Sequence, residues 1–248
     1  MENKNIIDQA FITAAGLGER MRPLTDECCK PMVIVQDKPI IGHVLDKLRA
    51  AGVRRIGVNS FYKPEGLEAY LQQYARQYPE LTLTAVREDT LLDTGGGIKN
   101  GLSTILSDRP FYIVSGDSYW EDAAGHSVLK DMAQAFNPAT MDMMLLLRNL
   151  SSMTITKGSG DYDISANGQI VRSLNQSGQY TWTSVRIIKN NSLFKGTPEG
   201  PFSFRILMDE AEKSGRLYGH IHQAEWHHFS TPADVEAVNR LQREKDCA

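Results

Sequence analysis

A short loop near the start of the chain combines two glycines, two arginines and a lysine. Residues 11–32 read FITAAGLGERMRPLTDECCKPM. Glycines allow backbone N–H groups to approach a ligand closely and tolerate positive φ. Arginine guanidinium groups are planar donors that match the oxygens of a phosphate. The loop therefore predicts a polyphosphate site, and Lys30 adds a further cation at its end.

Two common phosphate-binding loops do not fit this stretch. A Walker A loop requires a Gly-Lys pair before Ser or Thr, and the chain contains no Gly-Lys pair. A dinucleotide-binding loop requires a third small residue three positions after the second glycine, where this chain has Met21 and then Pro23. The alternative is a tight turn with solvated arginines. Lys30, fixed between Cys29 and Pro31, favours the phosphate site.

A second candidate for chemistry is Asp117, which follows the apolar run at residues 111–114. An aspartate at the end of a buried strand suits Mg²⁺ that also contacts phosphate oxygens. Gly116 allows a close approach and favours this interpretation over an aspartate that caps a turn or a helix. The three glycines at 95–97 precede a predicted helix, and by themselves they indicate a hinge or a helix start.

Alternating strands and helices must position these residues. Short apolar runs predict strands, and apolar residues at helical spacing predict helices. We expect a mostly parallel, doubly wound, Rossmann-like sheet with helices on both faces. Asn167-Gly168 and Ser177-Gly178 predict two hairpin turns in a small antiparallel elaboration near residues 158–188, over one side of the sheet. The predicted strands are 10–15, 55–59, 81–86, 110–115 and 142–147, and the predicted helices are 39–51, 64–78, 98–106, 128–136, 203–214 and 232–244, with strands between the last two helices.

Ligands of such sheets bind at the carboxyl ends of the strands. The loops after Ala15, Asn59, Val86 and Ser115 should therefore share one cleft. Asn59 and Glu88 end neighbouring strands and are candidates for hydrogen bonds to a base or a sugar. Each is equally compatible with an ordinary loop residue.

Composition limits the function classes. With 41% hydrophobic and 23% charged residues, the chain is typical of a globular protein, and we expect one domain over residues 1–248. A net charge of -3 gives no basic field for nucleic acid, and no apolar run approaches the about 18 residues of a membrane span. The three cysteines form no disulfide framework, and residues 1–5 lead into the first apolar run without a signal-peptide region, so we expect a cytoplasmic protein. The oligomeric state is open, and a monomer is compatible with the sequence.

Ordered motifs run along nearly the whole chain. They are Ala14-Ala15-Gly16-Leu-Gly18-Glu-Arg20-Met-Arg22-Pro23-Leu-Thr, Lys30-Pro31-Met, Lys38-Pro39-Ile-Ile, Leu92-Asp93-Thr94-Gly95-Gly96-Gly97, Ser115-Gly116-Asp117, Gly160-Asp161-Tyr162 and the stretch 226–231. Together they resemble the signature of the sugar-1-phosphate nucleotidylyltransferases. Within that family the chain looks most like the short bacterial N-acetylmuramate-1-phosphate uridylyltransferases, which lack the C-terminal β-helix of longer relatives.

The resemblance implies attack by a sugar 1-phosphate on the α-phosphorus of a nucleoside triphosphate, with release of pyrophosphate. The reactants carry roughly five or six negative charges, so positioning and charge neutralisation should dominate catalysis. Arg20 would then stabilise the pyrophosphate, and Lys30 would contact the α-phosphate and the incoming oxygen. As a residue type alone, Lys30 is also compatible with a surface lysine in a turn.

The remaining site residues are predicted in the same way. Thr94 to Gly96 would flank the nucleobase, where missing side chains admit a flat ring. Asp161 and Trp226 would hold the sugar, although an aspartate before a hairpin and a core tryptophan are the ordinary alternatives. The predicted nucleotide-binding residues are Ala14, Ala15, Gly16, Gly18, Glu19, Arg20, Lys30, Asn59, Glu88, Thr94, Gly95, Gly96 and Ser115.

One stretch departs from the family pattern. The pattern Trp-x-Asp-x-Gly-Thr supplies a second metal ligand, but here His228 replaces the aspartate and Ser230 the glycine. Imidazole suits Mn²⁺ or Zn²⁺ better than Mg²⁺. We predict Mg²⁺ on Asp117, with Mn²⁺ as the alternative if His228 is a ligand. His220, His222, His227 and His228 also invite a zinc interpretation, but no cysteine joins them and surface histidines are favoured.

Three functions follow, from two classes. The leading hypothesis is a metal-dependent transferase that uses UTP and N-acetylmuramate 1-phosphate, and mannose-1-phosphate guanylyltransferase is the second enzyme hypothesis. His228 and Ser230 motivate a third hypothesis, a catalytically silent protein that binds a sugar nucleotide.

Overall fold

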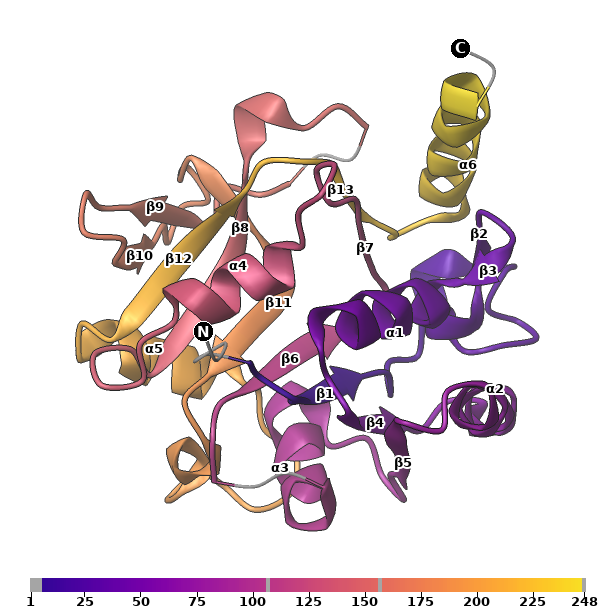
Figure 1. Ribbon diagram of the computed structural model, residues 1–248, viewed down its shortest axis with the longest axis horizontal. Coiled ribbons are helices and arrows are strands. Elements are labelled where there is room, and N and C mark those ends of the chain that lie inside the picture. Colours follow the sequence, from indigo (N-terminus) through magenta and orange to yellow (C-terminus); the bar gives the residue numbers. More distant parts are fainter. Residues whose placement is uncertain (1–5, 106–107, 156–157, 247–248) are drawn as a thin grey trace.

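A large mixed sheet forms the centre of the computed structural model, which describes residues 6–105, 108–155 and 158–246 (Figure 1). Its strands are β1 (Gln9–Thr13), β4 (Arg55–Ser60), β5 (Thr82–Arg87), β6 (Phe111–Ser115), β8 (Met143–Asn149), β9 (Tyr162–Ile164), β10 (Ile170–Arg172), β11 (Tyr180–Ile188) and β12 (Leu217–His222). The nine strands follow the order β10-β9-β11-β6-β1-β4-β5, with β8 beside β11 and β12 beside β8. The pairs of β1 with β4, β1 with β6 and β4 with β5 are parallel, so these strands bring their carboxyl ends to one edge.

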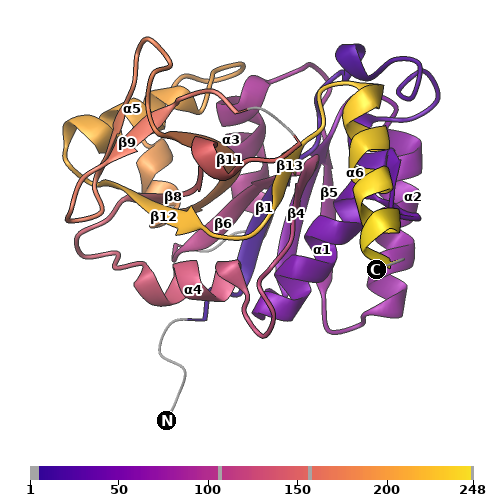
Figure 2. The same ribbon diagram turned by 90° about the horizontal axis from the view of Figure 1, so that it is seen from above.

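Helices cover both faces of this sheet (Figure 2). They are α1 (Ile40–Ala51), α2 (Pro64–Gln77), α3 (Asp93–Ile105), α4 (Val128–Ala135), α5 (Arg205–Lys213) and α6 (Pro232–Asp246), with 3-10 turns at Glu19–Met21, Lys30–Met32, Leu150–Ser152 and Asn191–Phe194. Apolar residues of α1, α2 and α4 share one buried cluster with one face of the sheet. Those of α3 and α5 share a second cluster with the other face. None of the helices in the described part of the chain combines the length and the apolar character needed to cross a bilayer.

The predicted fold class is confirmed, and most predicted elements lie within a few residues of their observed bounds. Strand β1 ends at Thr13, earlier than predicted, because the N–H of Ala14 leaves the ladder and donates to Oδ1 of Asn59 at 2.6 Å. Helix α3 begins at Asp93 and includes the three glycines, whereas the prediction began it at Ile98. The predicted end of this helix at Leu106 lies outside the described residues.

The antiparallel part continues the main sheet. Strand β11 pairs with β6 in antiparallel fashion, so this part lies in the sheet and does not lie over one side of it. The predicted turn at Asn167-Gly168 joins β9 to β10, as expected. The second predicted hairpin, at Ser177-Gly178, is wrong because β9 lies between β10 and β11. The chain turns earlier there, where the N–H of Ser177 donates to Oγ of Ser173 at 3.0 Å.

Two small antiparallel sheets complete the structure. One joins β2 (Ile34–Val35) to β3 (Lys38–Pro39), and the other joins β7 (Ser118–Trp120) to β13 (Trp226–His228). The second small sheet places His228 opposite Ser118, one residue after Asp117. The sequence pattern did not reveal β7. Its pairing nevertheless brings the two predicted metal-binding positions to the same region of the molecule.

Candidate active site

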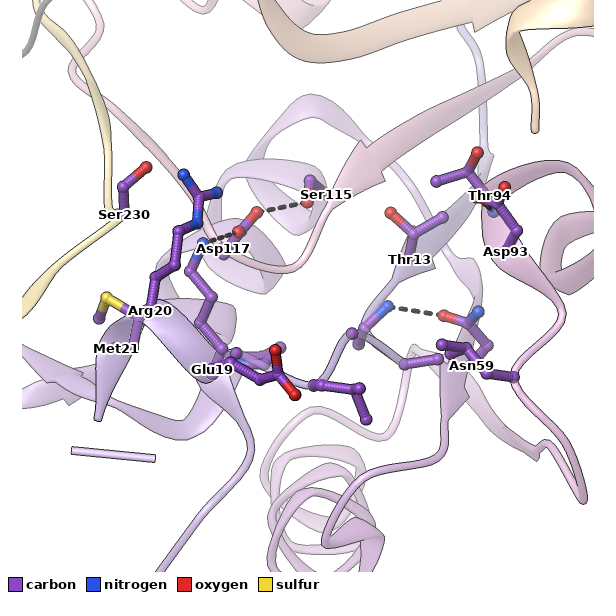
Figure 3. A pocket seen from close by; sticks show the side chains of 18 residues that line it. Thr13, Glu19, Arg20, Met21, Asn59, Asp93, Thr94, Ser115, Asp117 and Ser230 are labelled. Atoms are coloured by element: carbon purple, nitrogen blue, oxygen red, sulfur yellow. Dashed lines mark hydrogen bonds and ion pairs between the residues drawn. The ribbon is translucent and has the colours of Figure 1, made fainter. Parts of the chain in front are cut away.

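A cavity of about 780 Å³ lies at the carboxyl ends of β1, β4 and β6. Figure 3 shows Arg20 and Asp117 on one side of it and Asn59 and Thr94 on the other. The cleft shared by the strand-end loops is therefore present, as predicted from the carboxyl ends of the strands. The predicted residues that line it are Ala14, Ala15, Gly16, Gly18, Glu19, Arg20, Lys30, Asn59, Thr94, Ser115 and Asp117. It is also lined by Thr13, Leu17, Met21, Pro31, Leu91, Asp93 and Ser230, none of which was predicted to bind the nucleotide.

The glycine loop has a defined shape around Gly18. This residue has a φ of 66°, in the left-handed region that favours glycine. A Cβ atom there would also lie 3.1 Å from the side chains of both Lys30 and Thr25. Thr25 donates from Oγ1 to the carbonyl of Gly18 at 2.9 Å, and the side chain of Met21 is buried in an apolar cluster. These contacts fix the loop while Arg20 stays exposed at the cavity.

An ion pair joins the predicted phosphate cation to the predicted metal ligand. Nζ of Lys30 pairs with Oδ2 of Asp117, and Oγ of Ser115 donates to Oδ1 of the same carboxylate (Figure 3). Burial alone would raise the pKa of Asp117, but the Lys30 ammonium and the two hydrogen bonds outweigh it and hold that pKa below its ordinary value. Asp117 is therefore ionised at neutral pH.

A buried network fixes the opposite wall. Asn59 accepts the Ala14 N–H and donates from Nδ2 to Oε1 of Glu88 at 2.7 Å, while Oε2 of Glu88 accepts the N–H of Leu92 at 2.9 Å. Asn59 and Glu88 are 3% and 5% exposed, and Asn59 alone of the two lines the cavity. In the structure Glu88 thus joins Asn59 on β4 to the loop at Leu92. A contact of Glu88 with the base or sugar stays a prediction.

The glycines of α3 explain why this helix can start so early. A Cβ at Gly97 would lie 2.5 Å from Oε1 of Glu88, and one at Gly96 would lie 2.3 Å from the carbonyl oxygen of Gly200. A Cβ at Gly95 would lie 2.3 Å from the ring of Phe202. Close packing therefore leaves no room for a side chain at these three positions. A contact of a base with Gly95 and Gly96 stays a prediction. Thr94 accepts the N–H of Phe204 through Oγ1 at 3.0 Å.

The chain is similar in sequence to known nucleotidyl transferases. Residues 9–148, more than half of the chain, match the family model described as Nucleotidyl transferase. An N-acetylmuramate alpha-1-phosphate uridylyltransferase from Caulobacter vibrioides is 35% identical over 237 residues, which are 94% of this chain and 96% of that protein. The chain belongs to the nucleotidyl transferase family. The predicted resemblance and the prediction of an enzyme are confirmed.

Two further proteins are similar to this chain over most of its length. A protein named N-acetylmuramate alpha-1-phosphate uridylyltransferase from Neisseria meningitidis serogroup B is 28% identical over 240 residues, 94% of this chain and 95% of that protein. A solved structure of UTP-bound UGPase from Acinetobacter baumannii superposes with a TM-score of 0.77 at 16% identity, covering 95% of this chain and 93% of that one. At that identity the last similarity supports the fold alone.

The nucleotidyl transferase has a second cavity, of about 450 Å³, which shares Asp93 and Thr94 with the first. Asp161 lines this cavity, and its contact with a sugar stays a prediction. One oxygen of its carboxylate accepts hydrogen bonds from Oγ1 of Thr181 and the N–H of Trp182, both at 2.9 Å. Asp161 is thus held in place by β11.

The stretch that departs from the family pattern, residues 226–231, begins with β13. The rings of Trp226 and His228 stack with centroids 6.1 Å apart, so both side chains lie on the same side of the strand. Trp226 is 5% exposed within an apolar cluster, so its contact with a sugar stays a prediction. Burial lowers the pKa of His228, and the Lys30 and Arg20 cations add to this while Asp117 opposes it. The imidazole of His228 is therefore neutral near pH 7.

The histidine-rich stretch is less exposed than predicted. His222 and His227 are 3% and 1% exposed, so the expectation of surface histidines is wrong for these two. His220 and His222 both line a small third cavity. Within the described ranges, no cluster of three or more His, Cys, Asp or Glu side chains is arranged to hold a metal ion.

Proposed function

We propose that this nucleotidyl transferase joins UTP to N-acetylmuramate 1-phosphate and releases pyrophosphate. The single observation that supports this pair is the 35% identity to the Caulobacter vibrioides uridylyltransferase over nearly the full length of both chains. The cavity adds the required chemistry, since the glycine loop with Arg20, and Lys30, line it at the strand ends. The smaller second cavity adjoins it on the side of Thr94 and supplies room for a sugar.

In the proposed reaction, an oxygen of the sugar phosphate forms a bond to the α-phosphorus while the bond from that phosphorus to the β-phosphate oxygen breaks. No covalent enzyme intermediate is needed. Backbone N–H groups from Gly16 to Arg20 bind the β- and γ-phosphates, and the Arg20 guanidinium stabilises the charge on the departing pyrophosphate. Lys30 moves from Asp117 to the α-phosphate and the incoming oxygen, because the phosphates offer the ammonium more negative charge than one carboxylate does.

The other residues position the two reactants. Thr94, Gly95 and Gly96 bound the side on which the base would lie, and Asn59 fixes that wall through Ala14 and Glu88. Asp161 accepts sugar hydroxyl groups in the second cavity. Each of these roles is part of the proposal.

Asp117 gives this site one carboxylate that would suit a divalent cation. Mg²⁺ commonly uses one or two protein carboxylates and takes its other ligands from phosphates and water. Asp117 is ionised and half-buried beside the phosphate loop, so it would hold such an ion, and the ion would neutralise phosphate charge. We propose Mg²⁺ as the ion. The charge of Asp117 affects the pKa of His228, so the two side chains lie close together. As a neutral imidazole, His228 would favour Mn²⁺ if it became a ligand.

Two further proposals concern the domain organisation and the cellular location. Strands from residues 9 to 222 share one sheet, which supports a single domain over residues 1–248. A cytoplasmic location fits an enzyme that consumes UTP. The oligomeric state stays open, and a monomer is compatible with a cavity lined by one chain.

A substrate panel tests the function. UTP, GTP, CTP and dTTP would each be combined with the 1-phosphates of N-acetylmuramate, N-acetylglucosamine, glucose and mannose, and pyrophosphate release would be measured. We expect the highest kcat/KM with UTP and N-acetylmuramate 1-phosphate. A preference for GTP with mannose 1-phosphate would overturn the substrate assignment. Absence of pyrophosphate with every pair and with either Mg²⁺ or Mn²⁺ would indicate a silent binding protein.

A further inference from the structure

A buried arginine lines the second cavity and has no carboxylate partner in the part of the chain that the structure describes. Arg186 lies on β11 and is 3% exposed, and its neighbours in the strand, Val185 and Ile187, are fully buried. Between Trp182 and Arg186 the pairing of β11 with β8 shifts register, and Ser184 has a φ of 63°. Irregularities of this kind redirect side chains. Here Trp182 and Arg186 both face the second cavity.

Two aromatic rings hold the guanidinium group in place. Its central carbon lies 3.8 Å from the ring centroid of Phe204 and 4.9 Å from that of Trp182. Stacking of this kind uses the faces of the guanidinium plane and leaves the N–H groups at its edge for other partners. The group is thus oriented before any ligand arrives.

The edge of this group lacks a strong acceptor. Among the described residues, Nε of Arg186 has no hydrogen-bond partner, and Nη1 has only the sulfur of Met208 at 3.8 Å, a weak acceptor. Burial lowers the pKa of Arg186 to about 9, and the nearby Tyr162 opposes this only in part. The side chain is therefore still a cation at pH 7, and it is a buried cation that an anion would stabilise.

The other two arginines of the cavity differ from Arg186. Arg172 forms an ion pair with Asp209, and Arg205 is mostly exposed and lies 3.8 Å from the same carboxylate. Among the residues that the structure describes, no carboxylate forms an ion pair with Arg186. Asp161 also lines the cavity, but its carboxylate is engaged by Thr181 and by the backbone of β11.

We propose that Arg186 binds a carboxylate carried by the sugar of the sugar 1-phosphate. This inference rests on the proposed function. The second cavity adjoins the phosphate site through Asp93 and Thr94, so a sugar whose phosphate lies near Lys30 can extend into it. A carboxylate matches the two parallel donors at the edge of a guanidinium group, whereas hydroxyl groups alone would leave the buried charge uncompensated.

This assignment makes Arg186 a specificity residue. N-acetylmuramate carries a lactyl ether with a carboxylate, and N-acetylglucosamine is the same sugar without it. Arg186 would therefore separate these two substrates, while Asp161, which lines the same cavity, would contact hydroxyl groups that both of them have.

The test measures binding of UDP-N-acetylmuramate and UDP-N-acetylglucosamine by calorimetry, which requires no turnover. The parent should bind the first at least about tenfold more tightly. Arg186→Met should reduce that ratio by roughly 10- to 100-fold, the range expected for a hydrogen bond to a charged group, and leave the affinity for UDP-N-acetylglucosamine within about twofold of the parent. Arg186→Lys keeps the charge without the planar fork and should give an intermediate ratio.

Arg205→Met is the matched control, because it removes a cavity arginine that is already near a carboxylate and should keep the parental ratio. Thermal unfolding monitors the fold, and Arg186→Met should be at least as stable as the parent because it removes an unpaired buried charge. Equal loss of both affinities in Arg186→Met, an unchanged ratio, or a parent without preference would overturn the inference. If pyrophosphate release from the substrate panel still favours UTP with a sugar 1-phosphate, then only the role of Arg186 fails.

Discussion

At the scale of single residues, the Lys30–Asp117 ion pair dominates the site. The pair lies where the proposed reaction places the phosphates, and the side chains of Lys30 and Asp117 are only 14% and 19% exposed. Without reactants, the ammonium group is neutralised by the carboxylate. Bound phosphates must therefore compete with Asp117 for Lys30, unless a cation takes over the carboxylate at the same time.

Lys30→Ala tests the cation directly. We expect kcat to fall by about 10²- to 10³-fold, as when a donor to transition-state charge is removed. The substitution also leaves the Asp117 carboxylate without its ion pair, so the free energy of unfolding should fall by about 1–3 kcal/mol. Lys47→Ala, which breaks a Lys–Asp pair with Asp122 away from the cavity, is the control and should keep the parental kcat. An unchanged kcat in Lys30→Ala would remove Lys30 from the mechanism.

The two predicted metal positions should not be equivalent. Asp117→Asn should abolish metal-dependent activity because it removes the charge that would hold the ion, whereas His228→Ala should weaken activity less. His228→Asp should stay active and shift the preference towards Mg²⁺ over Mn²⁺, since a carboxylate is the harder ligand. Titrations of activity with each metal distinguish these variants. Equal inactivity of Asp117→Asn and His228→Ala would show that the histidine is an equal partner.

At the scale of elements, helix α3 and strand β4 meet through Gly97. Gly97→Ala would place a methyl group against Glu88 and Asn59, whose hydrogen bond also holds the loop at Ala14. We expect a loss of about 2 kcal/mol in the free energy of unfolding and weaker UTP binding, because overpacking displaces the wall of the cavity. Urea denaturation and calorimetry measure the two effects.

Gly66→Ala is the matched control for that substitution. Gly66 also lies inside a helix, α2, but a Cβ there meets no atom within 4 Å. Alanine should therefore stabilise the protein by about 0.5–1 kcal/mol and leave UTP binding unchanged. Similar stability changes in the two variants would contradict the packing role of Gly97.

Elements were more predictable than the contacts between them. Buried strands such as β6 and β8 appear as short apolar runs in the sequence, and amphipathic helices such as α1 appear by their spacing. The start of α3 was missed because glycine is a poor helix former, and only packing against the segment of Phe202 explains it.

Contacts between distant residues follow from the tertiary fold. Lys30 and Asp117 are 87 positions apart, and no sequence pattern indicated that they form an ion pair. The hydrogen bond between Asn59 and Glu88 could not be predicted either. A carboxylate at the end of a strand can contact a ligand or bond to a neighbouring side chain, and its position in the sequence does not distinguish the two. Arg186 did leave a signal, since a charged residue interrupts an otherwise apolar strand end, Val185 to Ile188.

At the scale of the whole molecule, buried histidines should make stability depend on pH. Burial lowers the pKa values of His43, His220 and His222 below the ordinary value. For His222 the Arg148 cation adds to this effect. Between these lowered values and about pH 6.5 the unfolded chain binds more protons than the folded chain, so the free energy of unfolding should fall as pH decreases.

Urea denaturation at about pH 7.5 and pH 5.5 measures this dependence, because the lower value lies within the interval where the unfolded histidines take up protons. His222→Gln keeps a side-chain donor for the carbonyl of Glu225 and should reduce the difference between the two conditions. A free energy of unfolding that stays constant or increases on acidification would contradict this account.

The strand order also sets when each part of the sheet can close while the chain is being synthesised. Strand β1 has both of its neighbours, β4 and β6, once residue 115 has been made. Strand β8 gains its neighbour β12 only with residues 217–222. Until then one side of β8 presents unpaired backbone N–H and C=O groups, which are prone to pair with another chain. A nascent chain stalled before Leu217 should therefore already hold the glycine loop, residues 16–20, at the end of β1 and still be liable to aggregate.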